Sequence, residues 1–211
     1  KQDKIKEIHF NDIKEGFINT MESNLDLNNL KKEDTKIHLH NQDANLFMLT
    51  KGGFDYIDLD PFGSPNPFLA AAISQISRGG ILAVTATDTA ALTGTYSKVT
   101  RRKYWSRSMK NYMMHETGLR ILIRKVQLQG VQFDKALTPI LSYHKDHYFR
   151  VYFRSDKGKK KCDDLIKKHQ YFLYCNNCLN FKSSDFNHEI CVCKNNFISA
   201  GPFWSGRLYE K

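Results

Sequence analysis

The sequence of 211 residues predicts a doubly wound α/β protein with a small cysteine-bearing domain at its carboxyl end. Strand and helix patterns follow one another in the order strand, helix, strand, strand, helix, strand, which is typical of this fold class. One segment, residues 81–86, is apolar throughout, as in strands that are buried on both faces. The composition then becomes lysine-rich and cysteine-bearing, which predicts two domains, at residues 1–155 and 156–211.

The first three elements lie before residue 41. Residues 5–12 form a predicted strand with an acidic end, and residues 14–28 form a predicted helix with one apolar stripe. That stripe consists of Phe17, Ile18, Met21 and Leu25. Residues 37–40 form a short strand that leads into the loop with Asp43.

The next strand, at residues 54–60, ends at Pro61, because proline cannot donate a hydrogen bond to a neighbouring strand. Asp60 therefore lies at the carboxyl edge of the sheet, where open α/β sheets bind their ligands. A helix at residues 67–77 follows, and we expect Gly79 and Gly80 to break it before the apolar strand.

The last elements of the larger domain are a helix and a hairpin. Residues 115–129 place Leu119, Leu122, Ile123 and Val126 on one side of a helix, which Gly130 is expected to end. Strands at residues 137–143 and 148–154 then pair as an antiparallel hairpin that closes the sheet.

The turn after the third strand carries the most informative chemistry. An Asp-Pro-aromatic turn can aim the Asp60 carboxylate and nearby carbonyl oxygens at one planar amino group, while Phe62 offers a face for stacking. Exocyclic amines of bases need such acceptors, because their lone pair is conjugated into the ring. An ordinary turn is the competing interpretation, since aspartate and proline are common turn formers.

Neighbouring polar residues have more modest predicted roles. Asp58 lies two residues before Asp60 on the same face of the strand, and we expect a structural role for it, paired with an arginine. Thr85, Thr87 and Asp88 follow or end a buried strand. They are candidates either for lining a base pocket or for simple turn chemistry.

The charge balance favours a polyanionic partner such as RNA. The formal net charge is +10, and contacts between phosphates and basic side chains release counterions. Residues 101–107 mix basic and aromatic side chains, a combination typical of nucleic-acid surfaces. Residues 157–161 are interpreted as a solvated lysine-rich loop.

Five cysteines favour a metal site in a reducing compartment over a disulfide framework. Four of them cluster, and tetrahedral zinc uses such sets: Cys175, Cys178, Cys191 and Cys193. The second pair is spaced Cys-x-Cys, so His188 is a substitute ligand to consider. Four protein ligands close a site to water, which predicts a structural zinc. Cys162 is left over and is expected to be inert.

No apolar run is long enough to span a bilayer, and the chain does not open on a secretory leader. We therefore expect a soluble, intracellular protein without a membrane partner. Its compartment, whether nucleus, mitochondrion or prokaryotic cytoplasm, stays open, and a monomer is the expected state.

The longer motifs resemble those of the tRNA guanine-26 N2-dimethyltransferase family. They are Asp58-Leu-Asp-Pro-Phe-Gly-Ser-Pro65, Thr85-Ala-Thr-Asp-Thr-Ala90, His115-Glu-Thr-Gly-Leu-Arg-Ile-Leu122, Tyr148-Phe-Arg-Val-Tyr152, the cysteine cluster and Gly201-Pro-Phe-Trp-Ser-Gly206. The resemblance covers nearly the whole chain. It implies a Rossmann-like class I methyltransferase fold, S-adenosylmethionine as cofactor, tRNA as partner, and two successive methylations of one guanine amine.

The resemblance also implies roles for individual residues. Asp12 would hold the ribose hydroxyls of the cofactor, Asp43 would accept a hydrogen bond from the adenine amine, and the Ala44 backbone would contact the adenine ring. Asp60, with Pro61 and Phe62, matches the catalytic motif. The region from residue 156 matches part of a tRNA-binding domain with a four-cysteine zinc site.

The chain departs from the family pattern at its amino end. The first strand and the glycine-rich motif that follows it have no counterpart, and the pairs Gly52–Gly53 and Gly79–Gly80 lie elsewhere. The methyltransferase domain is therefore expected to be incomplete at this end, as in an internal portion of a longer protein.

Two alternatives stay open. Asp-Pro-aromatic turns also serve methyltransferases that act on adenine, cytosine or glutamine amines, so another base or RNA could be the substrate class. The second alternative is a non-catalytic RNA-binding module, which the missing glycine-rich motif would allow.

Overall fold

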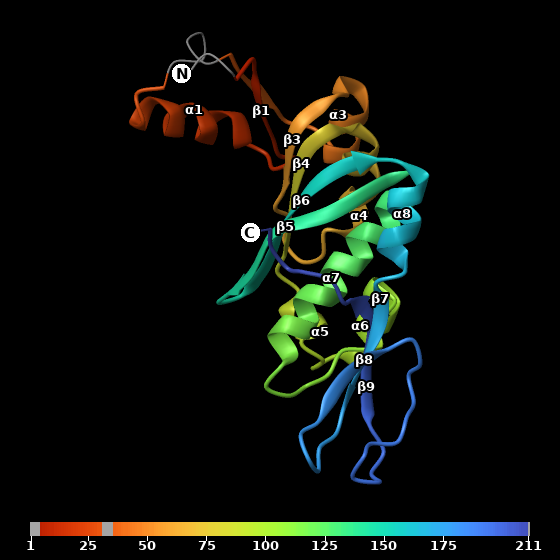
Figure 1. Cartoon of the computed structure of the whole chain (residues 1–211). Helices are drawn as coiled ribbons and strands as arrows, with labels where there is room; N and C mark the ends of the chain where they lie inside the picture. Colours follow the sequence, from red (N-terminus) through yellow and green to blue (C-terminus); the bar gives the residue numbers. More distant parts are fainter. Residues whose placement is uncertain (1–4, 31–35, 211) are drawn as a thin grey trace. The chain divides into compact units, whose positions relative to one another are not determined.

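The computed structural model describes residues 5–30 and 36–210, which fall into two compact units, Lys1–Gly52 and Gly53–Lys211 (Figure 1). Each unit has its own sheet or sheets. The functional division predicted between residues 155 and 156 stays a prediction.

The first unit contains a two-stranded parallel sheet and two described helices. Its elements are β1 (Ile8–Asn11), α1 (Phe17–Leu27), β2 (Ile37–His40) and α3 (Ala44–Lys51). The predicted strand at residues 37–40 is confirmed, and the helix predicted from residue 14 begins at Phe17, after Gly16 in the left-handed region. The helix α3 lies in a segment for which the sequence predicted only a loop. The buried apolar residues described in this unit are Leu25, Ile37, Phe47 and Met48.

The second unit contains a four-stranded mixed sheet in the order β3-β4-β6-β5. Its strands are β3 (Phe54–Leu59), β4 (Ile76–Ala86), β5 (Lys135–Lys145) and β6 (Tyr148–Lys157). β3 and β4 are parallel, whereas β6 is antiparallel to both of its neighbours. The predicted antiparallel hairpin is thus confirmed.

The sequence predicted that Gly79 and Gly80 end a helix, and this prediction is wrong. α4 (Asn66–Gln75) stops earlier, and β4 begins at Ile76 and passes through both glycines. The register between β3 and β4 shifts at this point. A Cβ atom on Gly80 would lie 3.0 Å from the Asp55 carbonyl oxygen, so glycine permits a close approach of the two strands.

The second unit also contains the helices α5 (Thr89–Leu92), α6 (Ser97–Tyr104), α7 (Met114–Val131) and α8 (Lys159–Ile166). α7 packs against β5 and β9, and its four predicted core residues are buried (Figure 1). Gly130 is the last residue but one of this helix, so the helix ends one residue after the glycine that was expected to end it. A Cβ atom at Gly130 would lie 2.7 Å from the Lys135 carbonyl oxygen. The glycine therefore allows β5 to pass close to α7.

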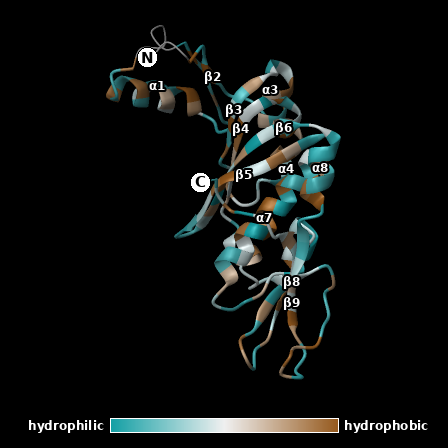
Figure 2. Ribbon diagram, viewed as in Figure 1, coloured by the Kyte–Doolittle hydropathy of each residue, from teal (hydrophilic) through white to brown (hydrophobic). Residues whose placement is uncertain are grey.

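The lysine-rich run interpreted as a loop instead opens α8. Only Cys162 and Leu165 of this helix are buried, and the rest of its surface is largely hydrophilic (Figure 2). Within the run, Lys161 forms an ion pair with Asp156 at 2.9 Å. The helix therefore buries two apolar side chains and leaves most of its charge in solvent.

A three-stranded antiparallel sheet in the order β8-β7-β9 follows. Its strands are β7 (His169–Tyr174), β8 (Phe181–Ser184) and β9 (Ile198–Trp204). Arg120 of α7 donates hydrogen bonds to the carbonyl oxygens of Trp204 and Gly206, both at 2.9 Å, which ties this sheet to the helix. Among the described residues, no helix is both long and apolar enough to cross a membrane.

Candidate active site

The turn after β3 is held in place by the residue that follows β4. The Gly63 amide donates to Thr87 Oγ1 at 2.6 Å, and the Thr87 amide donates to the Gly63 carbonyl oxygen at 2.9 Å. Gly63 adopts a φ of 82°, which favours glycine. Asp60, Pro61 and Phe62 therefore lie on a short segment that is anchored at both ends, by the buried Leu59 and by this pair of hydrogen bonds.

The two side chains of this turn with predicted roles, Asp60 and Phe62, face solvent. Asp60 is exposed, and the Phe62 ring is as accessible as in an open peptide, with an exposed fraction of 104%. Large aromatic rings dominate binding energies when they become covered, because each buries a large apolar area. An exposed carboxylate two residues before an exposed ring can receive a planar group that carries an amine.

A second layer of contacts supports the turn from α6. The buried Tyr104 hydroxyl donates to Asp88 Oδ1 at 2.5 Å and lies 3.2 Å from Ser64 Oγ. Asn66 Nδ2 donates to the Lys103 carbonyl oxygen at 2.8 Å. Burial and the Asp88 carboxylate raise the pKa of Tyr104, so this hydroxyl stays a donor at neutral pH.

These contacts show what Thr87 and Asp88, which follow β4, do in the structure. Thr87 and Asp88 use their side-chain oxygens to hold the turn and α6, so in this structure they serve turn chemistry. α6 is thereby joined directly to the segment that presents Asp60.

The predicted arginine partner of Asp58 is Arg150, whose guanidinium donates to Asp58 Oδ2 at 2.6 Å. Arg150 also donates to Thr85 Oγ1 at 2.6 Å and to the Tyr152 hydroxyl at 2.8 Å. The network thus crosses three neighbouring strands, β3, β4 and β6. Burial, together with the charge of Asp58, raises the pKa of Tyr56 to about 12, so its hydroxyl donates to Asp58 at 3.1 Å.

The sequence predicted an arginine partner for Asp58, but it did not identify Arg150 or join Thr85 and Tyr152 to the same network. Arg150 and Tyr152 alternate with buried apolar residues in β6, so they lie on one face of this strand. Which residues this face contacts depends on the order of the strands in the sheet, and the local sequence does not determine that order.

The predicted cofactor residues lie in the first unit. Asp12 follows β1, and its Oδ1 accepts from the Lys14 amide at 2.8 Å. Asn41 Nδ2 donates to the carbonyl oxygens of Asp12 and Lys14, at 2.7 and 2.9 Å, so the loops after the two parallel strands are tied together. This contact brings the Asp12 loop and the loop that leads to Asp43 to one edge of the sheet.

Asp43 and Ala44 begin α3. The Asp43 carboxylate caps the helix by accepting from the Leu46 amide at 2.9 Å, and Ala44 is the first helical residue. Helix starts leave amide donors without partners inside the helix. In the same unit, Asn11 Oδ1 is buried without a hydrogen-bond partner next to Asp12. The edge therefore offers carboxylate, amide and carboxamide groups of the kind that a ribose and an adenine ring need.

The four clustered cysteines form one compact group in the second unit, and their sulfur atoms all lie within 4.8 Å of one another. The pairs Cys175–Cys193 and Cys178–Cys191 are 3.5 and 3.4 Å apart between sulfurs, and all four are free thiols. Zinc–sulfur bonds of about 2.3 Å in a tetrahedron place sulfurs about 3.8 Å apart. The group therefore fits a tetrahedral metal ion.

The surroundings of one cysteine of the cluster, Cys193, favour its thiolate form. Asn195 donates to Cys193 Sγ at 3.4 Å and lowers the pKa of this thiol to about 5. Cys175 and Cys191 are buried with Leu173 and Phe197 in a small core at the end of the third sheet. The four sulfurs meet despite the Cys-x-Cys spacing of the second pair. His188, which the sequence offered as a substitute ligand, is not part of this group.

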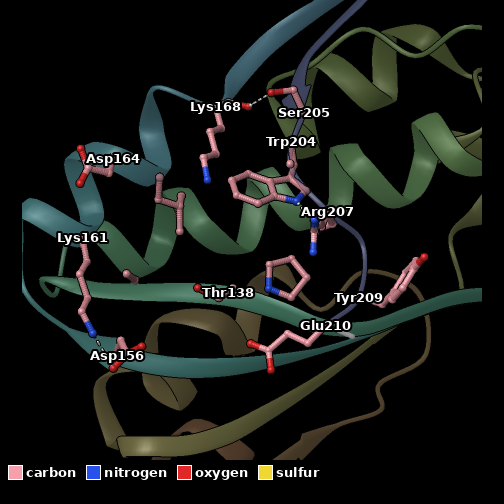
Figure 3. Close-up of a pocket in the computed structure, with 14 residues that line it drawn as sticks. Thr138, Asp156, Lys161, Asp164, Lys168, Trp204, Ser205, Arg207, Tyr209 and Glu210 are labelled. Atoms are coloured by element: carbon pink, nitrogen blue, oxygen red, sulfur yellow. Dashed lines mark hydrogen bonds and ion pairs between the residues drawn. The ribbon is translucent and has the colours of Figure 1, made fainter.

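A cavity of about 860 Å³ lies elsewhere in the second unit, between β5, α8 and the segment after β9 (Figure 3). None of the predicted site residues lines it. Its charged rim is partly neutralised, because Lys161 pairs with Asp156 and Glu210 pairs with Arg154 at 2.6 Å. The predicted catalytic turn is an exposed edge and does not coincide with this cavity.

The fold places the chain among the α/β methyltransferases. A solved structure described as the complex of Trm1 from Pyrococcus horikoshii with S-adenosyl-L-methionine matches it with a TM-score of 0.85 and 34% identity. The match covers 97% of this chain and 57% of that one. The model of the N2,N2-dimethylguanosine tRNA methyltransferase family matches residues 2–211. The chain belongs to this family, and the resemblance stated from its motifs is confirmed.

Curated relatives agree with this assignment. A tRNA (guanine(26)-N(2)/guanine(27)-N(2))-dimethyltransferase of Aquifex aeolicus is 39% identical over 98% of this chain and 54% of its own length. A tRNA (guanine(26)-N(2))-dimethyltransferase of Methanobrevibacter smithii is 40% identical over 99% of this chain and 54% of its own length. The chain thus spans about half the length of the curated relatives it matches.

Proposed function

We propose that the protein carrying this chain transfers methyl groups from S-adenosylmethionine to the exocyclic N2 of guanine 26 in tRNA, giving N2,N2-dimethylguanosine. The observation that carries the proposal is the anchored turn that exposes the Asp60 carboxylate beside the uncovered Phe62 ring. Membership of the family and the names of the relatives support the substrate and the cofactor.

The proposed chemistry at Asp60 follows from the electronic structure of the amine. The N2 lone pair is conjugated into the guanine ring, so the amine is a weak nucleophile until a carboxylate accepts one of its hydrogen bonds. Bound S-adenosylmethionine supplies an electrophilic methyl group. As the new N–C bond forms, the bond between the methyl group and sulfur would break and leave a neutral thioether, and positive charge would build on N2. Asp60 would orient the amine and accept the proton that leaves it.

Phe62 has a complementary role in the proposal. A guanine inside a folded tRNA must leave its stack before its amine can reach an enzyme group, which costs a few kcal/mol. The exposed Phe62 ring can replace part of the lost stacking. The turn would then hold both the ring and the amine of one base.

We also propose which residues bind S-adenosylmethionine. Asp12 would hold the ribose hydroxyls, Asp43 the adenine amine, and the Ala44 amide the adenine ring. The carboxylates, the helix start and the unpartnered Asn11 oxygen at this edge support the assignment. The capping bond uses Asp43 Oδ1, so the adenine contact would use the other oxygen.

A structural zinc ion is the second proposed cofactor, held by Cys175, Cys178, Cys191 and Cys193. The mutual distances of their sulfurs support this assignment. Four protein ligands leave no position for water, so the ion would stabilise the region from residue 156, which we assign to tRNA binding, and take no part in the chemistry. An intracellular monomer acting on tRNA belongs to the same proposal.

The decisive test is nucleoside mass spectrometry of an unmodified tRNA transcript after incubation with S-adenosylmethionine and the full-length protein. We expect methylated N2-guanosine products that are lost when guanine 26 of the transcript is replaced by adenine. Methylation of adenine or cytosine would instead support another substrate class. Binding of tRNA without any methylated product from the folded protein would support the RNA-binding alternative.

A basic surface for the tRNA backbone is offered by α6. Arg101 and Arg102 are exposed on this helix, which is bonded through Lys103 to the turn that carries Asp60. Replacing both arginines by alanine is expected to weaken tRNA binding, and to reduce the slope of log affinity against log salt by about 2 if each meets one phosphate.

The matched control for this pair is the double substitution Arg78→Ala and Lys145→Ala, which removes the same charge from exposed positions of β4 and β5, outside α6 and outside the region from residue 156. Fluorescence anisotropy at several salt concentrations measures both variants. Equal slopes for the two pairs would mean that the net charge of the chain matters and the position of α6 does not.

A further inference from the structure

We propose that Glu7, His9 and His38 form a second metal site, on the two-stranded sheet of the first unit, for a divalent first-row transition-metal ion. The site shares no residue with the cysteine cluster or with the proposed catalytic turn. Among the described residues, these three and the four cysteines are the sets of potential ligands whose donor atoms gather within 4.8 Å.

The parallel register of β1 and β2 creates this gathering. His9 lies opposite His38, and Asn11 lies opposite His40, so the three histidines share one face of the sheet. Ile8 lies opposite Ile37 on the other face. A shift of one residue between the strands would separate the histidine side chains, so the cluster follows from strand pairing and not from sequence proximity.

The distances suit coordination through one ion. Glu7 Oε1 lies 3.5 Å from His9 Nε2, and Glu7 Oε2 lies 3.8 Å from His38 Nε2. Ligands bonded at about 2.0–2.2 Å in tetrahedral or octahedral sites are about 3–3.5 Å from one another. The side chains of Glu7 and His38 are 60% and 47% exposed, so both can make the small rotation that closes the site.

His9 is oriented as a metal-bound histidine usually is. Its Nδ1 lies 2.9 Å from His40 Nε2, while its Nε2 points toward Glu7. Ligating histidines typically bond a partner through the other ring nitrogen, which fixes the ring and the tautomer. With Nδ1–H donated to His40, His9 Nε2 carries the lone pair that a metal ion would bind.

His40 is suited to this positioning role by its surroundings. The ring of Phe47 packs against it with centroids 4.6 Å apart, which holds it in place. His40 Nε2 is thereby kept within hydrogen-bonding distance of His9 Nδ1.

The donor set selects the class of ion. Two imidazoles and one carboxylate suit zinc, cobalt, nickel, copper or ferrous iron, whereas magnesium and calcium prefer oxygen ligands alone. A bound ion would join β1 to β2, the strands whose carboxyl ends lead to Asp12 and Asp43. Metal binding at Glu7, His9 and His38 would therefore stabilise the first unit.

The test is titration of the untagged protein with Co²⁺ after the cysteine cluster has been saturated with zinc, followed by calorimetry and absorption spectroscopy. We expect one further saturable site whose spectrum lacks thiolate-to-cobalt charge transfer. His38→Ala should weaken this binding at least about 10-fold, because even outer partners of metal ligands typically contribute 10- to 100-fold. His147→Ala removes another exposed histidine and should leave the affinity unchanged.

A second variant guards against a misfolded sheet. Glu7→Gln keeps the size of an exposed side chain and removes only its charge, and it should also weaken Co²⁺ binding at least about 10-fold. Unchanged circular dichroism without metal would show that the variants fold. Absence of a saturable site in the wild-type protein, or equal affinity in the wild type and the His38→Ala and Glu7→Gln variants, would overturn the proposal.

Discussion

Replacing Asp60 by asparagine is expected to slow methyl transfer by roughly 100- to 10,000-fold, the usual contribution of a positioned acid–base group. Asparagine keeps the size of the side chain and a carbonyl acceptor, but it cannot accept the proton that leaves N2. The residue is exposed at the end of β3, so its replacement should change neither the fold nor tRNA affinity. Single-turnover rates with saturating tRNA measure the effect on the chemical step.

Asp55→Asn is the matched control for this experiment. Asp55 is an exposed aspartate of the same strand, five residues earlier, and no proposed step uses its carboxylate. We expect normal rates for this variant. A rate for Asp60→Asn within a factor of about three of the Asp55→Asn rate would remove Asp60 from the proton-accepting role, since general-base contributions are far larger.

Replacing Cys178 by serine is expected to abolish stoichiometric zinc binding and to unfold the end of the three-stranded sheet. Structural zinc contributes about 10–16 kcal/mol of apparent binding free energy in small zinc-binding peptides, and that energy is available only to the folded form. Cys178 is exposed, whereas Cys175 is fully buried in the small core. The Cys178 substitution therefore removes a ligand without making a cavity.

Metal analysis and limited proteolysis give two independent measurements of this loss. The wild-type protein should hold one zinc ion in the cysteine cluster and resist cleavage between β7 and β9, and Cys178→Ser should do neither. Cys162→Ser is the control, because Cys162 is buried in α8 and burial raises the pKa of its thiol, which disfavours metal binding. Full zinc content in Cys178→Ser would refute the four-cysteine assignment.

Local patterns predicted most elements of the larger domain because their periodicity was strong. The apolar stripe of α7 and the alternation in β6 each follow from the side that must be buried, so residues such as Leu122 and Val151 were enough to identify them. The prediction for Gly79 and Gly80 was wrong because it considered only the local pattern. Glycine weakens a helix, but here Gly80 serves a close contact with the backbone of β3.

The sequence by itself determined the fold class, the family and the position of Asp60 at a strand end, because a proline after an apolar strand and a long specific motif are local features. It also indicated the four cysteines and an arginine partner for Asp58. Only the tertiary structure identified Arg150 as that partner, joined Thr87 to the turn that carries Asp60 and placed His9 opposite His38. Those contacts depend on strand order and register, which are set by the packing of segments 24 to 92 residues apart.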